Sequence, residues 1–254
     1  MTAFDEVREQ IHWAETCIEH ARAKITAYIQ NDAFAAEIKV DAETGEYVHK
    51  IKLIRPVPIF IKGNLRNAMV DLKHAFDMAL HAAARTLGAS SFDSNYPWAD
   101  TPHGLCAIIE KRQSKPNTRL PEILVHEIRR QEPYGTGKGY PGGNDLIRQV
   151  AKMANDKHSI GIVAAAQVQS VSFKTIRINK GEIDLVKAWN PVKKEIEIAR
   201  FHGDIIYDNP KMTGNVFFER VGSLGIRPAI ETATNFCNGA KACLEGFEAV
   251  CAND

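Results

Sequence analysis

The sequence lacks the features that would place it in a well-known functional class. No uninterrupted apolar run reaches the length of a membrane span, and the first thirty residues are amphipathic and mixed in charge. We therefore expect no transmembrane helix, no signal peptide and no membrane partner. There is no GxSxG, HExxH or Walker motif and no dinucleotide fingerprint in its proper context. Hydrolase, metalloprotease, NTPase and dehydrogenase activities are disfavoured, and no cofactor is expected.

The chain also lacks an excess of charge of either sign. Its 32 lysine and arginine residues and 31 aspartate and glutamate residues give a formal net charge of +1. This provides no overall field to attract nucleic acid or an anionic surface, so such a partner must be bound by a local patch. At 254 residues with 44% hydrophobic content, the chain is long enough to bury a sizeable core.

Closely spaced cysteine pairs are absent as well. The five cysteines are odd in number and form no CxxC pair, and most of them lie among apolar residues at helical spacing. This pattern is typical of reduced thiols in a core rather than of a disulfide framework, and it predicts a cytoplasmic protein. The cysteines are Cys17, Cys106, Cys237, Cys243 and Cys251.

Apolar residues spaced by alternating threes and fours predict long helices. The clearest stripe runs from Phe4 to Tyr28, and similar stripes recur in the middle and at the end of the chain. The small residues Ala14 and Ala21 favour close packing inside a bundle, although the spacing is also compatible with a coiled-coil dimer. We expect helices at about 4–30, 60–87, 104–112, 120–131, 145–157 and 229–251.

Short runs rich in β-branched and aromatic residues predict strands in two parts of the chain. EIKV and YVHKIKLI are separated by a turn-like ETGE and indicate a β-hairpin, and isoleucine alternates with glutamate in the later run KEIEIARF. The predicted fold class is α+β: a mainly helical bundle with an N-terminal β-hairpin and a C-terminal antiparallel β-rich segment, closed by a C-terminal helix. We predict one domain over 1–254, with the bundle at 1–160 and 228–254, the hairpin at 33–55 and the β segment at 161–227.

Three short stretches stand out along the chain. They are Leu65-Arg66-Asn67-Ala68-Met69-Val70-Asp71-Leu72, Gln131-Glu132-Pro133-Tyr134 and Asn155-Asp156-Lys157-His158. In order and separation they resemble a widespread, largely uncharacterised bacterial family with LRxALDHL, QPY and NxDKHR motifs, which follow an amphipathic first helix and a hairpin ending in prolines. The resemblance covers about the first two thirds of the chain in layout, and the short motifs support it residue by residue.

The chain departs from that family pattern at two places. Val70-Asp71 stands where the family has Asp-His, and Ser159 stands where the family has arginine. The family pattern is in turn similar to the Arg-x4-6-His signature of HEPN-type helical-bundle ribonucleases, in which arginine, a following polar residue and histidine gather at a dimer interface. The resemblance implies RNA as a partner, a homodimer, and either metal-independent RNA cleavage or degenerate RNA binding.

The resemblance also implies roles for individual residues. In HEPN-type enzymes the 2′-hydroxyl attacks the adjacent phosphate, histidine moves protons and arginine stabilises the charge on the phosphate. Arg66 and Asn67 match the opening of the motif, Asp71 stands in place of the histidine, and His74 follows one turn late. An ordinary aspartate is ionised near neutrality, so His74 or His158 must supply the proton if cleavage occurs. The candidate catalytic residues are Arg66, Asn67, Asp71, His74 and His158.

The same residues also have structural interpretations. Arg66 and Asn67 are compatible with satisfying polar groups between helices or with facing solvent. His158 ends a predicted helix, where it suits the negative end of the helix dipole, and Asp156 would alternatively orient it as a base or ligand. The QEPY stretch is typical of a helix stop with a packed tyrosine. The glycine-rich stretch GTGKGYPGG at 135–143 lacks the Walker spacing, so a loop is favoured over a nucleotide site.

Two further functional classes remain compatible with the sequence. A metal-binding bundle is one, because Asp71, His74 and His81 share one side of a predicted helix and would need partners such as His20 or His158. A non-enzymatic dimeric interaction module is the other, with the bundle forming dimers and the β segment offering an edge to a partner.

The cysteine pattern generates a direct prediction. Thiol titration of the denatured protein without reductant should find five titratable thiols, because each cysteine of the sequence is expected to be reduced. Recovery of one or three thiols would reveal disulfides and contradict the predicted compartment.

Overall fold

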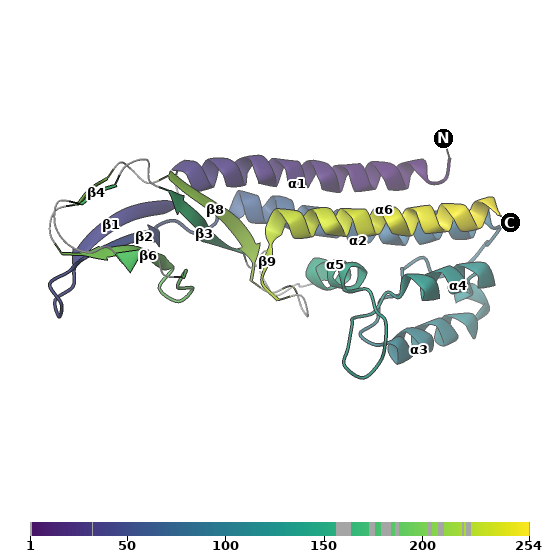
Figure 1. Ribbon diagram of the computed structural model, residues 1–254. Helices are drawn as coiled ribbons and strands as arrows, with labels where there is room; N and C mark the ends of the chain where they lie inside the picture. Colours follow the sequence, from purple (N-terminus) through teal and green to yellow (C-terminus); the bar gives the residue numbers. More distant parts are fainter. Residues whose placement is uncertain are drawn as a thin grey trace.

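The computed structural model has an elongated α+β architecture. Long helices run side by side, strands gather at one end, and shorter helices pack beneath the long ones, while both chain termini lie at the end away from the strands (Figure 1). The predicted fold class is confirmed. The residues that the structure describes are 2–31, 33–155, 164–172, 176–178, 184–185, 188–202, 205–207, 211–219, 221 and 225–253.

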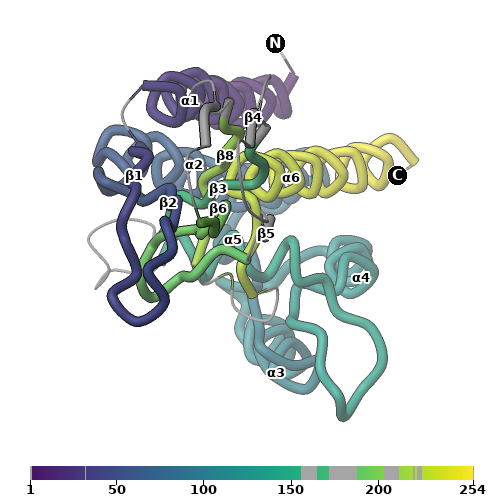
Figure 2. The backbone as a smooth tube through the Cα atoms, turned by 60° about the vertical axis from the view of Figure 1, so that its left-hand side comes forward, coloured from purple at the N-terminus to yellow at the C-terminus, as the bar shows by residue number. Residues whose placement is uncertain are grey.

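The long helices are α1 (Asp5–Asn31), α2 (Ile59–Thr86) and α6 (Ala229–Ala252). α1 contacts both of the others and lies above them in Figure 2. Gln10 contacts Asp71 and Lys24 contacts Phe60, so α1 and α2 run antiparallel. These helices agree with the predicted ranges within about two residues at each end.

Small residues line the faces at which these helices meet. Ala14 and Ala21 of α1, Ala68 of α2 and Ala233 of α6 are all fully buried. Alanine adds little thickness to a helix, so the backbones approach closely, as the sequence indicated for α1. α1, α2, α5 and α6 all contribute buried apolar residues to one contiguous core.

The shorter helices flank this core. They are α3 (Pro102–Gln113), α4 (Glu122–Gln131) and α5 (Asp145–Asn155), with a single 3₁₀ turn at Pro116–Thr118. Thr101 begins α3 by accepting a hydrogen bond from the Gly104 N–H at 3.0 Å, as an N-cap residue does. α5 contacts α2 and α6 through a buried face that includes Ile147 and Val150. The predicted end of this helix at 157 lies outside the described residues.

A buried polar network joins α4 to α6. The Tyr96 hydroxyl donates to Gln131 Oε1 at 2.5 Å, and Gln131 Nε2 donates to Glu127 Oε1 at 2.7 Å. Glu127 is only 5% exposed, and both of its oxygens accept hydrogen bonds from Arg130 at 2.7 Å. A Cβ atom at Gly246 of α6 would clash with this carboxylate. With the Glu127 carboxylate in this position, only glycine fits at 246, and any side chain there would displace the carboxylate.

The QEPY stretch at 131–134 ends α4 and forms hydrogen bonds with the glycine-rich loop at 135–143. Glu132 adopts a left-handed conformation with φ of 51° directly after the last helical residue, and Tyr134 is 7% exposed, which confirms the predicted helix stop with a packed tyrosine. The Glu132 carboxylate accepts hydrogen bonds from the Gly143 N–H at 2.9 Å and the Tyr134 hydroxyl at 3.1 Å. The loop is therefore tied to α4 by one carboxylate.

The described strands form three antiparallel sheets, with orders β1-β2-β6-β5, β3-β8-β9 and β4-β7. The hairpin of β1 and β2 does not stand alone, because β2 pairs with β6 and buries Ile51 against Ile196. No local pattern in the sequence indicates this shared sheet. The strands are β1 (Phe34–Val40), β2 (Tyr47–Leu53), β3 (Ala164–Ser172), β4 (Ile176–Ile178), β5 (Asp184–Leu185), β6 (Glu195–Phe201), β7 (Ile205–Tyr207), β8 (Lys211–Phe218) and β9 (Arg227–Pro228).

No disulfide joins the cysteines, all five of which lie in the described part of the chain. Cys237 and Cys243 are buried in the core, as the apolar spacing predicted, whereas Cys106 is exposed. Burial raises the pKa of the Cys237 thiol to about 12. That thiol is therefore protonated and unreactive at neutral pH.

Phe76 tests the predicted core. It is 1% exposed, and its ring centroid lies 5.2 Å from that of Tyr96 and 4.9 Å from that of Trp98. Phe76→Ala should lower the free energy of unfolding by about 3 to 5 kcal/mol, because it leaves a cavity among these rings. Ile59→Ala is the control, since Ile59 is a large apolar residue on the same helix that is 79% exposed. Denaturant unfolding should shift by less than about 1 kcal/mol for the control, and an equally small shift for Phe76→Ala would contradict its place in the core.

Candidate functional site

The candidate residues of α2 lie on its outward face. Arg66, Val70 and His74 follow one another at intervals of four and form one row along the helix, and Asn67 and Asp71 form the adjacent row. Arg66, Asn67 and His74 are exposed, whereas Asp71 is half-buried. Asn67, His74 and His81 are exposed on the side of α2 away from its apolar arc, and Asp71 on the same side is half-buried.

Asp71 lies at the seam between α1 and α2. Gln10 Nε2 of α1 donates a hydrogen bond to Asp71 Oδ1 at 2.9 Å. Burial raises the pKa of the Asp71 carboxyl above its usual value, against the opposing effects of the Gln10 hydrogen bond and the nearby His74. Asp71 therefore keeps a proton at higher pH than an exposed aspartate does.

Trp13 of α1 borders the same seam and is 63% exposed. It lies three residues after Gln10 and four before Cys17, so all three share one side of α1. Gln10 and Cys17 are both close to Asp71. Gln10 donates a hydrogen bond to it. The pKa of the Cys17 thiol is raised first by burial and then by the negative charge of Asp71. We call this surface the α1–α2 face. It comprises Gln10, Trp13, Asn67, Asp71 and His74. Arg66 lies five residues before Asp71 and therefore projects from another side of α2.

Two residues of the α1–α2 face were missed by the sequence analysis. Gln10 belongs to the site only because α1 packs antiparallel on α2, which no local pattern reveals. Trp13 did carry a signal, because it lies off the apolar stripe of its helix, and a large aromatic residue in that position is expected to be exposed.

Arg66 and Asn67 are available to a ligand. No described residue forms an ion pair or hydrogen bond with either side chain. Lys73 of the same helix is by contrast engaged, because its Nζ lies 3.6 Å from Asp77 Oδ2. The α1–α2 face thus carries an exposed aromatic ring, and an available cation lies further round α2.

The structure brings only part of the predicted site together. Asp71 and His74 are neighbours one turn apart, but Arg66 lies eight residues before His74, which is about 12 Å along the helix axis. Side chains on a helix tilt towards its N-terminus, so the longer Arg66 side chain extends further from His74. One copy therefore cannot place both on the same phosphate. His158 and the rest of Asp156-Lys157-His158 lie outside the described residues.

The metal-binding interpretation gains no support from the structure. Within the described ranges, no group of three or more histidine, cysteine, aspartate or glutamate side chains is placed to hold a metal ion. His81, one of the proposed ligands, packs beside the Phe92 ring with 5.2 Å between ring centroids.

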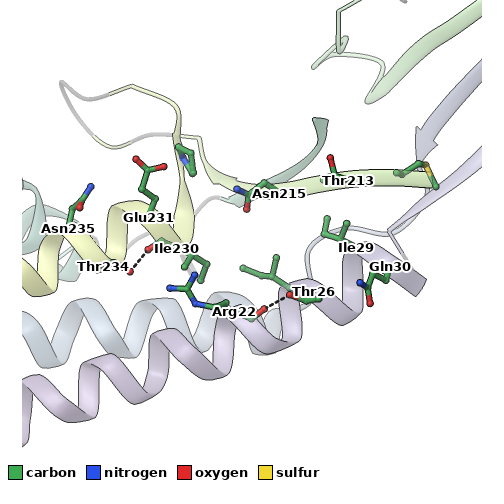
Figure 3. A pocket seen from close by; sticks show the side chains of 14 residues that line it. Arg22, Thr26, Ile29, Gln30, Thr213, Asn215, Ile230, Glu231, Thr234 and Asn235 are labelled. Carbon is green, nitrogen blue, oxygen red and sulfur yellow. Dashed lines mark hydrogen bonds between the residues drawn. The ribbon is translucent and has the colours of Figure 1, made fainter. Parts of the chain in front are cut away.

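A groove of about 560 Å³ opens between α1, β8 and the start of α6 (Figure 3). Two of its hydroxyl groups are used within their own helices, because Thr26 donates to the Arg22 carbonyl at 3.1 Å and Thr234 donates to the Ile230 carbonyl at 2.9 Å. Arg22 pairs with Glu19 at 3.1 Å. The groove is lined by none of the candidate site residues predicted from the sequence. Several of its polar side chains already form hydrogen bonds or ion pairs within the protein.

The chain matches no protein-family model, no curated protein and no solved structure. In the part of the chain that the structure describes, none of the helices is both long and apolar enough to cross a membrane.

The position of Asp71 predicts a pH dependence of stability. The pKa of Asp71 in the folded protein is raised above 3.8, its ordinary value in the unfolded chain. At pH values above the folded pKa, the charged carboxylate therefore lowers the free energy of unfolding. This cost disappears as the pH falls through the folded pKa and then through 3.8. Asp71→Asn keeps an oxygen for Gln10 and removes the charge. We expect the variant to be at least as stable as the wild type at pH 7, with the difference closing towards pH 3.8.

Asp5→Asn is the matched control for this measurement. Hydrogen bonds from Thr2 lower the pKa of Asp5, so its substitution should reduce stability at pH 7 and lose its effect in acid. Urea unfolding of both variants across pH 3 to 8 gives the two curves. An Asp71→Asn variant that behaves like Asp5→Asn would show that the Asp71 charge is stabilised in the fold.

Proposed function

We propose that this protein is RNA-directed and binds single-stranded RNA on the α1–α2 face. The observation that carries the proposal is the exposed indole of Trp13 at the seam between α1 and α2, together with Asn67 and Arg66 further round α2, whose side chains form no ion pair or hydrogen bond with any described residue. Proteins that hold single-stranded nucleic acid combine aromatic rings, on which bases stack, with basic groups that contact the phosphates. The resemblance of the Arg66-Asn67 stretch to HEPN-type motifs supports the same class of ligand.

The contacts suit recognition without sequence preference. A base of any type can stack on Trp13, and Arg66 and Asn67 would hold the backbone phosphate, which is the same in every nucleotide. His74 lies further along α2 and would meet a neighbouring nucleotide of the same strand. Because few cations are involved, we expect a shallow dependence of affinity on salt, with a slope of roughly −0.7 per phosphate contact.

Cleavage is a second activity that these residues support. In the metal-independent reaction a base removes the 2′-hydroxyl proton, the 2′-oxygen bonds to phosphorus, and the bond to the 5′-oxygen breaks as an acid protonates that oxygen. Asp71 and His74 are neighbouring candidates for the base and the acid. Arg66 would stabilise the charge on the phosphate, but in one copy it lies too far from His74 to do so.

A second copy of the chain would remove that obstacle. Val70 is 44% exposed and lies midway between Arg66 and His74 in one row of α2. If two α2 helices cross antiparallel about a two-fold axis at Val70, Arg66 of each copy meets His74 of the other. Cleavage is therefore proposed for such a dimer, and binding for either state.

The alternative is a non-enzymatic interaction module. Exposed large apolar side chains favour it, because Ile59, Phe60 and Val70 of α2 and Trp13 of α1 are all exposed. Exposed apolar groups are typical of protein-binding sites when they form one patch. This alternative leads if the protein does not bind RNA.

Binding of a labelled single-stranded oligoribonucleotide, measured by fluorescence anisotropy, tests the proposal. Trp13→Ala and Arg66→Ala should each weaken binding by roughly tenfold, since stacking of a base contributes about 1 to 3 kcal/mol. Arg85→Ala is the control, because Arg85 is an exposed arginine at the other end of α2. Circular dichroism confirms that each variant folds. Equal binding by all three variants would place RNA elsewhere, and no binding by the wild type would reject the proposal.

The same preparations reveal whether RNA is cleaved. Metal-independent cleavage should persist in EDTA, leave cyclic phosphate ends and be lost in His74→Ala and Arg66→Ala. Binding without cleavage would support the degenerate RNA-binding form of the proposal.

A further inference from the structure

β1 is an edge strand with an open side. In the described part of the chain it pairs with β2 on one side and is the outermost strand of its sheet. It lies in the hairpin at the end of the molecule away from the chain termini (Figure 1). Backbone N–H and C=O groups along a strand edge pair readily with another strand, so proteins usually shorten or shield such edges. β1 is seven residues long.

The two faces of β1 differ in character. Ala36, Ile38 and Val40 stand opposite residues of β2 that include the buried Ile51 and His49, so they belong to the apolar face of the sheet. Ile38 and Val40 are nevertheless 54% and 59% exposed, because nothing described lies beyond them. An additional strand would continue this face and cover both side chains.

Glu37 and Lys39 occupy the other, charged face of β1. They pair with each other, with 3.0 Å between Lys39 Nζ and Glu37 Oε1. Across the sheet Glu37 stands opposite Lys50, and Lys50 stands opposite Glu197. The row Glu197-Lys50-Glu37 alternates in sign and ends on a negative charge at the open edge.

We propose that two copies of this chain associate by pairing their β1 strands antiparallel about Ile38. In this register Ile38 faces its own counterpart, and Val40 faces Ala36 of the other copy. Glu37 of each copy faces Lys39 of the other. The alternating row of charges is thereby continued across the two-fold axis, and a sequence that is self-complementary about its centre meets the requirement of an isologous interface.

Neighbouring registers are disfavoured by the same side chains. Pairing about Glu37 places two glutamates opposite each other, and pairing about Lys39 places two lysines opposite each other. Pairing about a point between two residues, such as Glu37 and Ile38, would set the charged face of one strand against the apolar face of the other. A charged edge ordinarily resists pairing, but here the opposite charges match in the register about Ile38.

Charge reversal at two positions gives a specific test. Glu37→Lys alone would set lysine against Lys39 of an identical copy, and Lys39→Glu alone would set glutamate against Glu37. Each variant alone should therefore dimerise more weakly than the wild type, with the dissociation constant raised roughly tenfold or more, whereas an equimolar mixture should recover dimers in which every charge is matched. Sedimentation velocity over a range of concentrations measures the association.

The controls separate pairing from folding and from other interfaces. Lys193→Glu reverses an exposed charge outside β1 and should dimerise like the wild type. Circular dichroism and thermal unfolding confirm that Glu37→Lys tolerates the second lysine opposite Lys50 within its own sheet. A monomeric wild type, or dimers of undiminished strength in each single variant, would overturn the proposal, and so would a mixture that does not associate. RNA binding by the α1–α2 face is measured independently, so either proposal can fail alone.

Discussion

The close approach of α1 to α2 and α6 determines which side chains the bundle hides and which it leaves outside. Alanines at the centre of the contact let the helix backbones come together, and the residues at its flanks are then only partly covered. Asp71 lies at such a flank, within hydrogen-bonding distance of Gln10. Trp13 lies further out on the same side of α1 and remains exposed. The candidate site is thus a consequence of how the helices pack.

The order of elements along the chain explains the open edge of the sheet. The hairpin connects the end of α1 to the start of α2, so it stands at the end of the bundle where these helices change direction. β2 accepts β6 on its free side, and β5 follows beyond β6. β1 is left outermost in the described structure. The same topology that ties the C-terminal strands to the hairpin therefore leaves β1 as its boundary.

Local patterns were sufficient to predict the helices and the hairpin, because the periodicity of buried residues is a property of each element alone. They also predicted that Asp71, His74 and His81 share one side of their helix. They did not predict that β2 pairs with β6, since Lys50 and Glu197 are far apart in sequence and many charged strands could have paired. For the same reason the covering of Asp71 by Gln10 was missed. Four of the five candidate residues were predicted on one helix, whereas the environment of Asp71 depends on a second helix.

The contact between Glu127 and Gly246 makes the residues tolerated at one position depend on the residue at the other. Glycine in the middle of α6 lowers helix stability by about 1 kcal/mol relative to alanine, yet any side chain there would collide with the buried carboxylate. A side chain at 246 would therefore force the Glu127 carboxylate out of its place between Arg130 and Gln131, whereas a smaller residue at 127 would remove the clash. The cost of replacing Gly246 thus depends on which residue occupies position 127.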